Sequence, residues 1–286
     1  MVKLNHAQAE CYFPTQPGDD DRLNRTTHLG IGAHQDDLEI FAIHGILAGY
    51  ADENAFFTGV TVTDGRGAPR SGDYADLTDD ELWLIRTAEQ KQAADIGHYN
   101  AQFLLNYSSA AVKSPHREEV IADLIAIIEA CQPDIIYTHN LADKHDTHVA
   151  VALSVIEALR RMEPKAKALQ LYGSEVWRGL DWLPDDQKLA LDVSRHPELQ
   201  EELLQVFASQ IAGGKRYDLA TLGRRQANAT YAQSHNTDQA QLMTYAMDLT
   251  PLIQDPSLDI AGFIHQPIQN LAEDVKNRLT QLTGQP

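Results

Sequence analysis

The feature that most constrains the fold is a regular alternation between short apolar runs and longer segments with apolar residues at helical spacing. We predict strands for the short runs, at residues 27–33, 55–62, 99–107, 134–138 and 168–173. We predict helices for the periodic segments, at residues 38–50, 78–96, 117–131, 147–162 and 197–212. Strands that alternate with helices form a parallel sheet covered on both faces. We therefore expect an α/β chain with a Rossmann-like three-layer fold and a mostly parallel sheet.

The chain divides into a short arm and one larger unit. Residues 1–26 are polar, contain two prolines and an Asp-Asp-Asp run, and lack a period of 2 or 3.6, which indicates an N-terminal arm. Residues 27–286 show no convincing linker and no repeat. We therefore expect a single α/β domain there, with a motif-bearing core at 27–173 and a C-terminal elaboration at 174–286.

Composition excludes several classes of function. The 286 residues include 41 acidic and 23 basic side chains, a formal charge of −18, which disfavours binding to nucleic acid or to membrane surfaces. Apolar stretches such as residues 40–48 are well short of the roughly 20 residues of a membrane span. The spacing of Cys11 and Cys131 indicates neither a metal site nor a disulfide framework. The N-terminus lacks the apolar region of a signal peptide. We expect a soluble, cytoplasmic protein with two reduced thiols.

Two polar clusters follow predicted strands. His34-Gln35-Asp36-Asp37-Leu38-Glu39 comes after the first strand, and residues 139–148 (HNLADKHDTH) come after the fourth. In a parallel sheet both positions lie at the edge where ligands bind. One carboxylate with two imidazoles leaves coordination positions open, as a hydrolytic divalent metal requires. Taken alone, Asp36 and Asp37 are also typical of the start of a helix, and His145 and His148 are also typical of a solvated first turn. The coincidence of two such clusters favours a metal site.

These residues carry a family resemblance. AHQDDLE at 33–39 and HDTH at 145–148 resemble the AHPDD and HxxH motifs of the zinc-dependent N-acetyl deacetylases of the PIG-L/LmbE-like family. The resemblance extends over roughly residues 27–160. It includes Thr-Asp-Gly at 63–65, an RxxE helix at 86–89 that ends near Gly97, and PDIIYTH at 133–139.

The resemblance implies roles for five residues. It implies metal ligation by His34, Asp37 and His148, with Asp36 as the general base. It implies that His145 stabilises the tetrahedral oxyanion or protonates the leaving amine. Zinc is implied by the family alone, because Fe²⁺ and Mn²⁺ also tolerate two imidazoles and a carboxylate. The implied partner is a small amino-sugar substrate, and a homo-oligomer is compatible with the family.

The sequence departs from the family pattern at two places. Gln35 replaces the usual proline, and Thr147 replaces an aspartate that would orient a neighbouring imidazole. Because such partners set the tautomer and basicity of an imidazole, we expect Asp143 or Asp146 to supply the missing carboxylate.

Other residues are candidates for substrate binding. Arg66 and Arg70 lie in a loop after the second predicted strand, and Trp177 and Arg178 follow the fifth. We include Asp143 with them. Aromatic rings beside charged groups are typical of sugar sites, but the arginines also suit a solvated loop, and Trp177 and Trp182 also suit a core. A further basic cluster could bind a substrate anion or the acids of a partner subunit; it comprises Lys215, Arg216, Arg224 and Arg225.

The leading hypothesis is a metal-dependent hydrolase that removes the N-acetyl group from an amino sugar or its conjugate. A metal-dependent amidase acting on another small amide, such as a sugar-thiol conjugate, would use the same residues. A nucleotide-binding protein is disfavoured, because the third glycine of a G-x-G-x-x-G motif starting at Gly30 would fall on Gln35. A catalytically inactive sugar-binding relative would require a lost ligand or base, and all five key residues are present.

Overall fold

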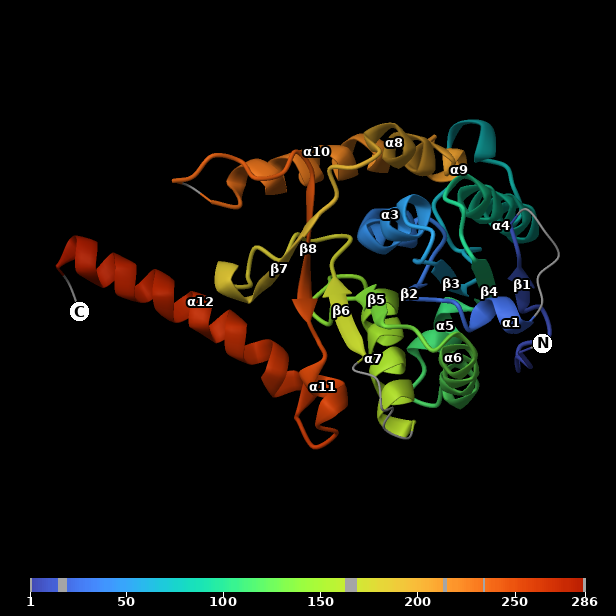
Figure 1. Cartoon of the computed structure of the whole chain (residues 1–286), viewed down its shortest axis with the longest axis horizontal. Coiled ribbons are helices and arrows are strands. Elements are labelled where there is room, and N and C mark those ends of the chain that lie inside the picture. Colours follow the sequence, from blue (N-terminus) through green and yellow to red (C-terminus); the bar gives the residue numbers. More distant parts are fainter. Residues whose placement is uncertain (1, 15–19, 163–168, 213–214, 234, 285–286) are drawn as a thin grey trace.

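The structure is a computed structural model that describes residues 2–14, 20–162, 169–212, 215–233 and 235–284. Its centre is an eight-stranded sheet with the order β1-β4-β3-β2-β5-β6-β8-β7 (Figure 1). The strands are β1 (Glu10–Tyr12), β2 (His28–Gly32), β3 (Phe57–Thr63), β4 (Ala101–Tyr107), β5 (Ile135–His139), β6 (Gln170–Ser174), β7 (Lys188–Asp192) and β8 (Met243–Asp248). The five strands predicted from sequence correspond to β2, β3, β4, β5 and β6.

The sheet is mixed, which corrects the expectation of a mostly parallel one. Its five central strands run parallel, but β1 pairs antiparallel with β4, and β8 pairs antiparallel with both β6 and β7. The reason is that these three outer strands lie outside the strand-helix-strand pattern on which the expectation rested. The arm thus contributes an edge strand, and the C-terminal elaboration contributes two more.

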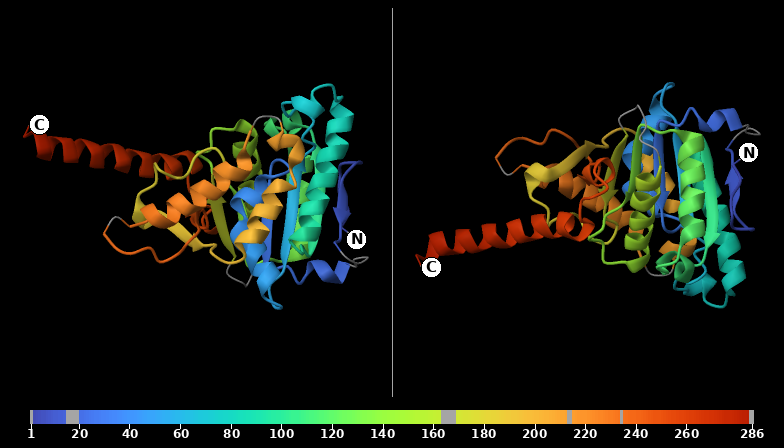
Figure 2. Two further views of the ribbon diagram at one scale, coloured as in Figure 1. Left: turned by 90° about the horizontal axis from the view of Figure 1, so that it is seen from above. Right: turned by 90° about the horizontal axis from the view of Figure 1, so that it is seen from below.

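Helices cover both faces of the sheet, in three layers (Figures 1 and 2). One face carries α2 (Asp37–Phe41), α3 (Ile43–Ala51), α4 (Asp79–Ile96), α8 (Pro197–Gln205), α9 (Ala208–Ile211) and α10 (Tyr217–Tyr231). The other carries α1 (Asp20–Leu23), α5 (Ser109–Lys113), α6 (Glu118–Cys131) and α7 (Asp146–Arg161). Two short 3₁₀ helices, η1 (Gly72–Tyr74) and η2 (Asp185–Gln187), complete the loops.

The chain ends with α11 (Pro251–Gln254) and α12 (Ile260–Thr283), a long helix that extends away from the sheet (Figure 2). Among the described residues, no helix combines the length and the apolar character needed to cross a bilayer.

The sheet separates two apolar cores because neighbouring residues of a strand face opposite sides. On β5, Ile136 packs with the α6 and α7 side, whereas Tyr137 packs with the α2 and α3 side; both are fully buried. The second core is tight at Gly45, where a Cβ atom would lie 2.6 Å from the Tyr137 ring. This close approach sets α3 directly against the sheet and fixes α2 above the end of β2.

Local sequence signals explain several helix ends. A capping box begins α4, since the Thr78 hydroxyl accepts from the Glu81 amide and the Glu81 carboxylate accepts from the Thr78 amide. The helix predicted at 38–50 is interrupted at Ala42, and the one predicted at 197–212 is divided into α8 and α9. Residues 213–214, the two glycines that follow the latter in the sequence, lie outside the described residues. The division into an arm and one domain stays a prediction.

Candidate metal centre

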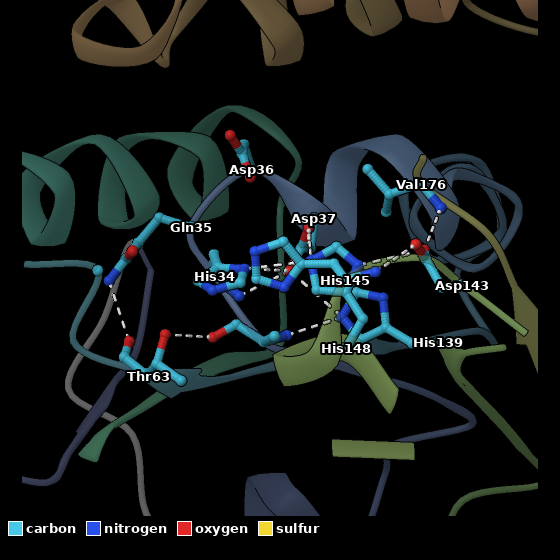
Figure 3. A network of polar contacts seen from close by, with 12 residues as sticks. His34, Gln35, Asp36, Asp37, Thr63, His139, Asp143, His145, His148 and Val176 are labelled. Atoms are coloured by element: carbon cyan, nitrogen blue, oxygen red, sulfur yellow. Dashed lines mark hydrogen bonds and ion pairs between the residues drawn. The ribbon is translucent and has the colours of Figure 1, made fainter. Parts of the chain in front are cut away.

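The two polar clusters meet at the carboxyl ends of β2 and β5 (Figure 3). These strands are parallel neighbours, paired through Leu29 with Ile136 and Gly30 with Tyr137, so the loops that follow them lie side by side. The loop after β2 is also held from β3, because the Thr63 hydroxyl donates to the Ala33 carbonyl at 2.7 Å. The sheet therefore places the residues expected to bind metal in one position.

The three residues predicted as metal ligands are brought together. His34 Nδ1 lies 3.2 Å from His148 Nε2 and 3.3 Å from Asp37 Oδ2, and His148 Nε2 lies 3.5 Å from Asp37 Oδ1. Bonds of 2.0–2.1 Å in a tetrahedral zinc site would separate its donor atoms by about 3.3 Å. The observed separations fit that value, so these side chains can hold a divalent ion without large movement.

Besides these three residues, two overlapping sets of donors in the described part of the chain could hold an ion. One comprises His34, His145 and His148, and the other comprises Asp37, His139 and His148. His145 stands beside the three predicted ligands, with its ring centroid 5.0 Å from that of His34 and 4.5 Å from that of His148. The cluster thus contains four imidazoles, whereas only two, those of His34 and His148, were predicted as metal ligands.

His139 is a residue of this site that the sequence analysis missed. It is fully buried, its ring stacks on His148 at 3.9 Å between centroids, and its Nε2 lies 3.2 Å from Asp37 Oδ2. That same Nε2 accepts the Ala33 amide at 2.9 Å, so its lone pair is already engaged. Burial lowers the pKa of His139 to about 4, which leaves the ring neutral. His139 therefore lies at the centre of the site, and its Nε2 could join Asp37 and His148 as a ligand only if it gave up the Ala33 amide.

The charge distribution matches a cation site. Burial alone would raise the pKa of Asp37, but nearby His148 and His139 outweigh burial and hold that pKa well below its usual range. Burial would lower the pKa of His148, yet the charges of Asp37 and Asp143 raise it. The ionised carboxylate of Asp37 therefore lies among imidazoles, an arrangement that suits a bound cation.

Asp143 is the carboxylate that orients an imidazole, which decides between the two candidates from sequence. Its Oδ2 accepts from His148 Nδ1 at 3.2 Å and from the Val176 amide at 3.0 Å, and its Oδ1 accepts from the His145 amide at 3.2 Å. Burial would raise its pKa, but the hydrogen bond from His148 and neighbouring charges lower it to about 2. Asp146 is exposed at the start of α7. These bonds suit Asp143 to positioning His148, and its direct contact with substrate stays a prediction.

Asp36 occupies an unusual backbone conformation. Its φ is 95°, in the left-handed region that residues with a Cβ rarely adopt, and it stands at the N-cap of α2. Burial raises the pKa of its carboxyl well above the usual range, although Arg86 opposes the change with its guanidinium 4.0 Å from Asp36 Oδ2. In Figure 3 the carboxyl group points away from the imidazole rings. Asp36 is thus a buried carboxyl with a high proton affinity beside the metal ligands.

A cavity of about 540 Å³ opens over the site. Its lining includes all five residues of the two motifs, namely His34, Asp36, Asp37, His145 and His148. Trp177, one of the substrate-binding candidates, also lines it, with its ring 5.8 Å from that of Tyr217. Lys113 and Lys215 add positive charge to the same cavity.

Three predicted substrate contacts do not line this cavity. Arg66 pairs with Asp64 and Asp80, and its guanidinium lies 4.3 Å from the Trp83 ring centroid. Arg70 pairs with Asp79. These arginines are held by acids of their own loop and of α4, and their role in substrate binding stays a prediction.

Arg178 is exposed and likewise does not line the cavity, although its backbone carbonyl accepts from Arg224 at 3.0 Å. The ring nitrogen of Trp182 donates to Glu175 at 3.0 Å, and this ring packs against the core. Of the two tryptophans, Trp177 is the one at the cavity.

The basic cluster near residue 220 does not act as one site. Arg216 pairs with Asp218, and Arg224 donates to the Val176 carbonyl at 2.7 Å. Arg225 is buried and donates to the Glu39 carbonyl of α2 at 2.6 Å. Only Lys215 of this cluster faces the cavity. Sequence proximity suggested a shared anion site, but the α10 helix directs these side chains to different partners.

Comparison with known proteins agrees with the sequence motifs. Residues 29–159 match the family described as PIG-L: GlcNAc-PI de-N-acetylase. Among solved structures, N,N'-diacetylchitobiose deacetylase from Pyrococcus horikoshii is similar with a TM-score of 0.62 and 18% identity, over 80% of this chain and 86% of that one. The conserved protein TT1542 from Thermus thermophilus has a TM-score of 0.60 and 15% identity, over 82% and 99%.

A third similar structure has a different described activity. GalB, the 4-carboxy-2-hydroxymuconate hydratase from Pseudomonas putida, has a TM-score of 0.59 and 18% identity, over 78% of this chain and 96% of that one. At this level of identity, the likeness shows the fold, and the fold alone does not select a reaction. The chain thus matches the PIG-L family description over residues 29–159 and shares its fold with the deacetylase from Pyrococcus horikoshii.

Proposed function

We propose that this protein is a metal-dependent hydrolase that removes the N-acetyl group from an N-acetylated amino sugar or its conjugate. The observation that carries the proposal is the convergence of His34, Asp37 and His148, with donor atoms 3.2–3.5 Å apart, in one cavity with Asp36. The match of residues 29–159 to the PIG-L family supports an acetyl amide as the scissile bond. Water adds to the acetyl carbon, the C–N bond breaks, and acetate and a free amine leave.

His34, Asp37 and His148 would hold the metal. We assign zinc because the family resemblance implies it, although Fe²⁺ and Mn²⁺ suit the same donors. A divalent ion held by these residues supplies a Lewis acid that polarises the amide carbonyl.

Asp36 acts as the general base. Burial raises the pKa of its carboxyl, which brings the proton affinity of the carboxylate closer to that of an efficient base near neutral pH. Its side chain lines the cavity, takes a proton from the attacking water, and delivers it toward the amine nitrogen. Arg86 stays beside it and limits the cost of a buried negative charge.

His145 stabilises the developing oxyanion or protonates the amine as it leaves. Burial lowers the pKa of this imidazole, so the ring is neutral and one nitrogen carries a proton. Its Nδ1 is buried without a hydrogen-bond partner in the described part of the protein. This nitrogen is therefore free to form a hydrogen bond with the substrate. Asp143 fixes the backbone amide of His145 and the ring of His148, so it sets the direction of both imidazoles.

The proposal includes a cytoplasmic enzyme that acts on a small molecule. Trp177 offers an aromatic surface in the cavity, as sugar sites commonly use. An amidase acting on another small amide, such as a sugar-thiol conjugate, remains the alternative, because the same residues would serve it.

The test is product analysis with zinc-loaded full-length protein. N-acetylglucosamine, N,N'-diacetylchitobiose and an N-acetylated sugar-thiol conjugate are incubated separately, and acetate and free amine are both quantified. We expect equal amounts of the two products from at least one acetylated amino sugar. Absence of acetate from every compound, with metal shown to be bound, would contradict the proposal.

A further inference from the structure

Three exposed lysines lie in the lining of the metal-centre cavity or beside its residue Trp177. Lys113, at the end of α5, and Lys215, just before α10, line the cavity, whereas Lys144 lies in the loop before His145. The Nζ atoms of Lys144 and Lys215 are each 5.5 Å from the ring centroid of Trp177, so both cations gather around the same cavity residue. All three lysines are exposed, and the metal-binding donors lie deeper. We call these three residues the lysine group.

The lysine group stands out because its charges are not neutralised. The chain has 41 acidic residues and 23 basic ones, so a cation on its surface easily finds a carboxylate. Arg66, Arg70 and Arg216 each pair with aspartates. Among the described residues, by contrast, no carboxylate oxygen lies within 4.0 Å of the nitrogen of any member of the lysine group. These unpaired cations converge on one cavity of an otherwise acidic protein.

We propose that the lysine group binds a phosphoryl group carried by the amino-sugar substrate. This inference rests on the proposed deacetylase function and specifies its substrate class. A chain with a charge of −18 repels anionic ligands, and the buried carboxylates of Asp36 and Asp37 add to that repulsion inside the cavity. The lysine group offsets it locally and attracts a doubly charged phosphoryl group. Lysine ammonium groups bind phosphate as point charges and need no bidentate geometry.

The position of the lysine group relative to the metal centre is fixed through the backbone. The Val176 amide donates to Asp143 Oδ2, which also holds the ring of His148. Trp177 follows directly, and its ring contacts Lys144 and Lys215 at a distance typical of cation–π pairs. A substrate held by its phosphoryl group at the lysines is therefore positioned relative to the residues that act on its acetyl group.

The first test compares kinetics on matched substrates. Acetate release by the zinc-loaded full chain is measured with N-acetylglucosamine, its 6-phosphate and its 1-phosphate, and with N-acetylmuramic acid as a carboxylate analogue. We expect kcat/KM for one of the phosphates to exceed that of the neutral sugar by about tenfold or more, mainly through KM. Preference for the carboxylate analogue over both phosphates would overturn the assignment of a phosphoryl group.

Lys113→Gln and Lys215→Gln test the lysine group directly. Each keeps most of the side-chain length and removes the charge, so each should reduce the ratio of kcat/KM for phosphorylated over neutral sugar by about tenfold. Lys276→Gln, on the exposed face of α12, is the matched control and should leave this ratio unchanged. Equal ratios in all three variants and the unmodified protein would overturn the inference.

A binding measurement separates this inference from the proposed function. Calorimetric titration of chelator-treated protein with glucosamine 6-phosphate and glucosamine 1-phosphate requires no turnover and avoids phosphate binding to a metal. Binding heat that Lys113→Gln or Lys215→Gln abolishes would support the lysine group as a phosphoryl site. If the same protein released no acetate, the proposed function would fail while this inference stood. Acetate release from neutral and phosphorylated sugars at equal efficiency, with no heat on titration, would overturn the lysine group while the proposed function stands.

Discussion

Asp143 Oδ2 lies 3.2 Å from Nδ1 of His148, five residues farther along the chain, and holds that ring with its Nε2 toward Asp37 and His34. The pKa of this carboxylate is lowered to about 2, so it stays ionised and accepts the Nδ1 proton of His148, which leaves Nε2 as the nitrogen that would bind a metal. This single contact sets the tautomer that a metal ligand needs.

Asp143→Asn therefore should weaken metal binding. An amide at this position can still accept a hydrogen bond but carries no charge, and loss of such a partner typically costs about 10- to 100-fold in metal affinity. The measurement is competitive titration of stripped protein with zinc and a chelating dye. Asp146→Asn, on the exposed first residue of α7, is the control and should bind zinc as the unmodified chain does. If the two variants bound zinc equally well, Asp143 would not have this role.

Asp36→Asn should separate catalysis from metal binding. Asparagine tolerates the left-handed conformation found here, φ 95°, better than most residues, so the loop should be preserved. Turnover should fall by about 10² to 10⁴, the range typical of a positioned base. Metal content, measured by atomic emission on the purified variant, should stay equal to that of the parent chain. A variant that had lost its metal would show that the roles of Asp36 and Asp37 are exchanged.

Arg225 should contribute strongly to stability. Its buried guanidinium donates to Gln200 Oε1 at 2.8 Å and to the Glu39 and Ile40 carbonyls of α2 at 2.6 and 3.2 Å. Arg225→Met leaves these acceptors without a donor and should lower the free energy of unfolding by about 3 kcal/mol. Chemical denaturation measures the change. Arg195→Met, which removes an exposed guanidinium, should alter stability by less than about 0.5 kcal/mol; a similar loss in both variants would contradict this account.

His28 should make stability depend on pH. Burial, assisted by the charge of His44, lowers the pKa of His28 from 6.5 to about 4. The unfolded chain takes up this proton near pH 6.5 and the folded chain does not until about pH 4. The contribution of His28 is therefore complete above pH 6.5 and is lost as the pH falls toward 4.

His28→Phe removes the titrating group and keeps an aromatic ring beside Tyr137. The variant should lose less stability than the parent chain when the pH is lowered from about 7 to about 4.5, as urea denaturation would measure. His265→Phe, on an exposed residue of α12, is the control and should follow the parent chain. A parallel decline for the parent chain and His28→Phe would mean that His28 takes up its proton equally in both states.

The central part of the fold could be predicted because its signals are local. Apolar runs and the Thr78–Glu81 capping box predict where β2 to β6 and α4 lie. The outer strands could not be predicted in the same way. The sequences ECY of β1 and KLALD of β7 are short and only partly buried, so their pairing depends on sheet edges that form elsewhere in the chain.

The candidate site was predictable where its residues belong to compact motifs and unpredictable where partners come from elsewhere. His34, Asp37 and His148 occupy motif positions at strand ends and converge as expected. His139 was missed because it ends β5 and has no spacing partner that identifies it as part of the site. The pairing of Arg66 with Asp80 could not be predicted, because Asp80 reaches it from the first turn of α4.

The most direct test of the central claim is zinc titration of stripped, full-length protein with acetate release as the readout. The account predicts no release from N-acetylated amino sugars in the stripped state. It predicts activity that rises with added zinc and levels off at one equivalent per chain, and no such rise in His148→Ala. Full activity in the stripped protein, or an unchanged response in His148→Ala, would contradict the claim that His34, Asp37 and His148 hold the catalytic metal.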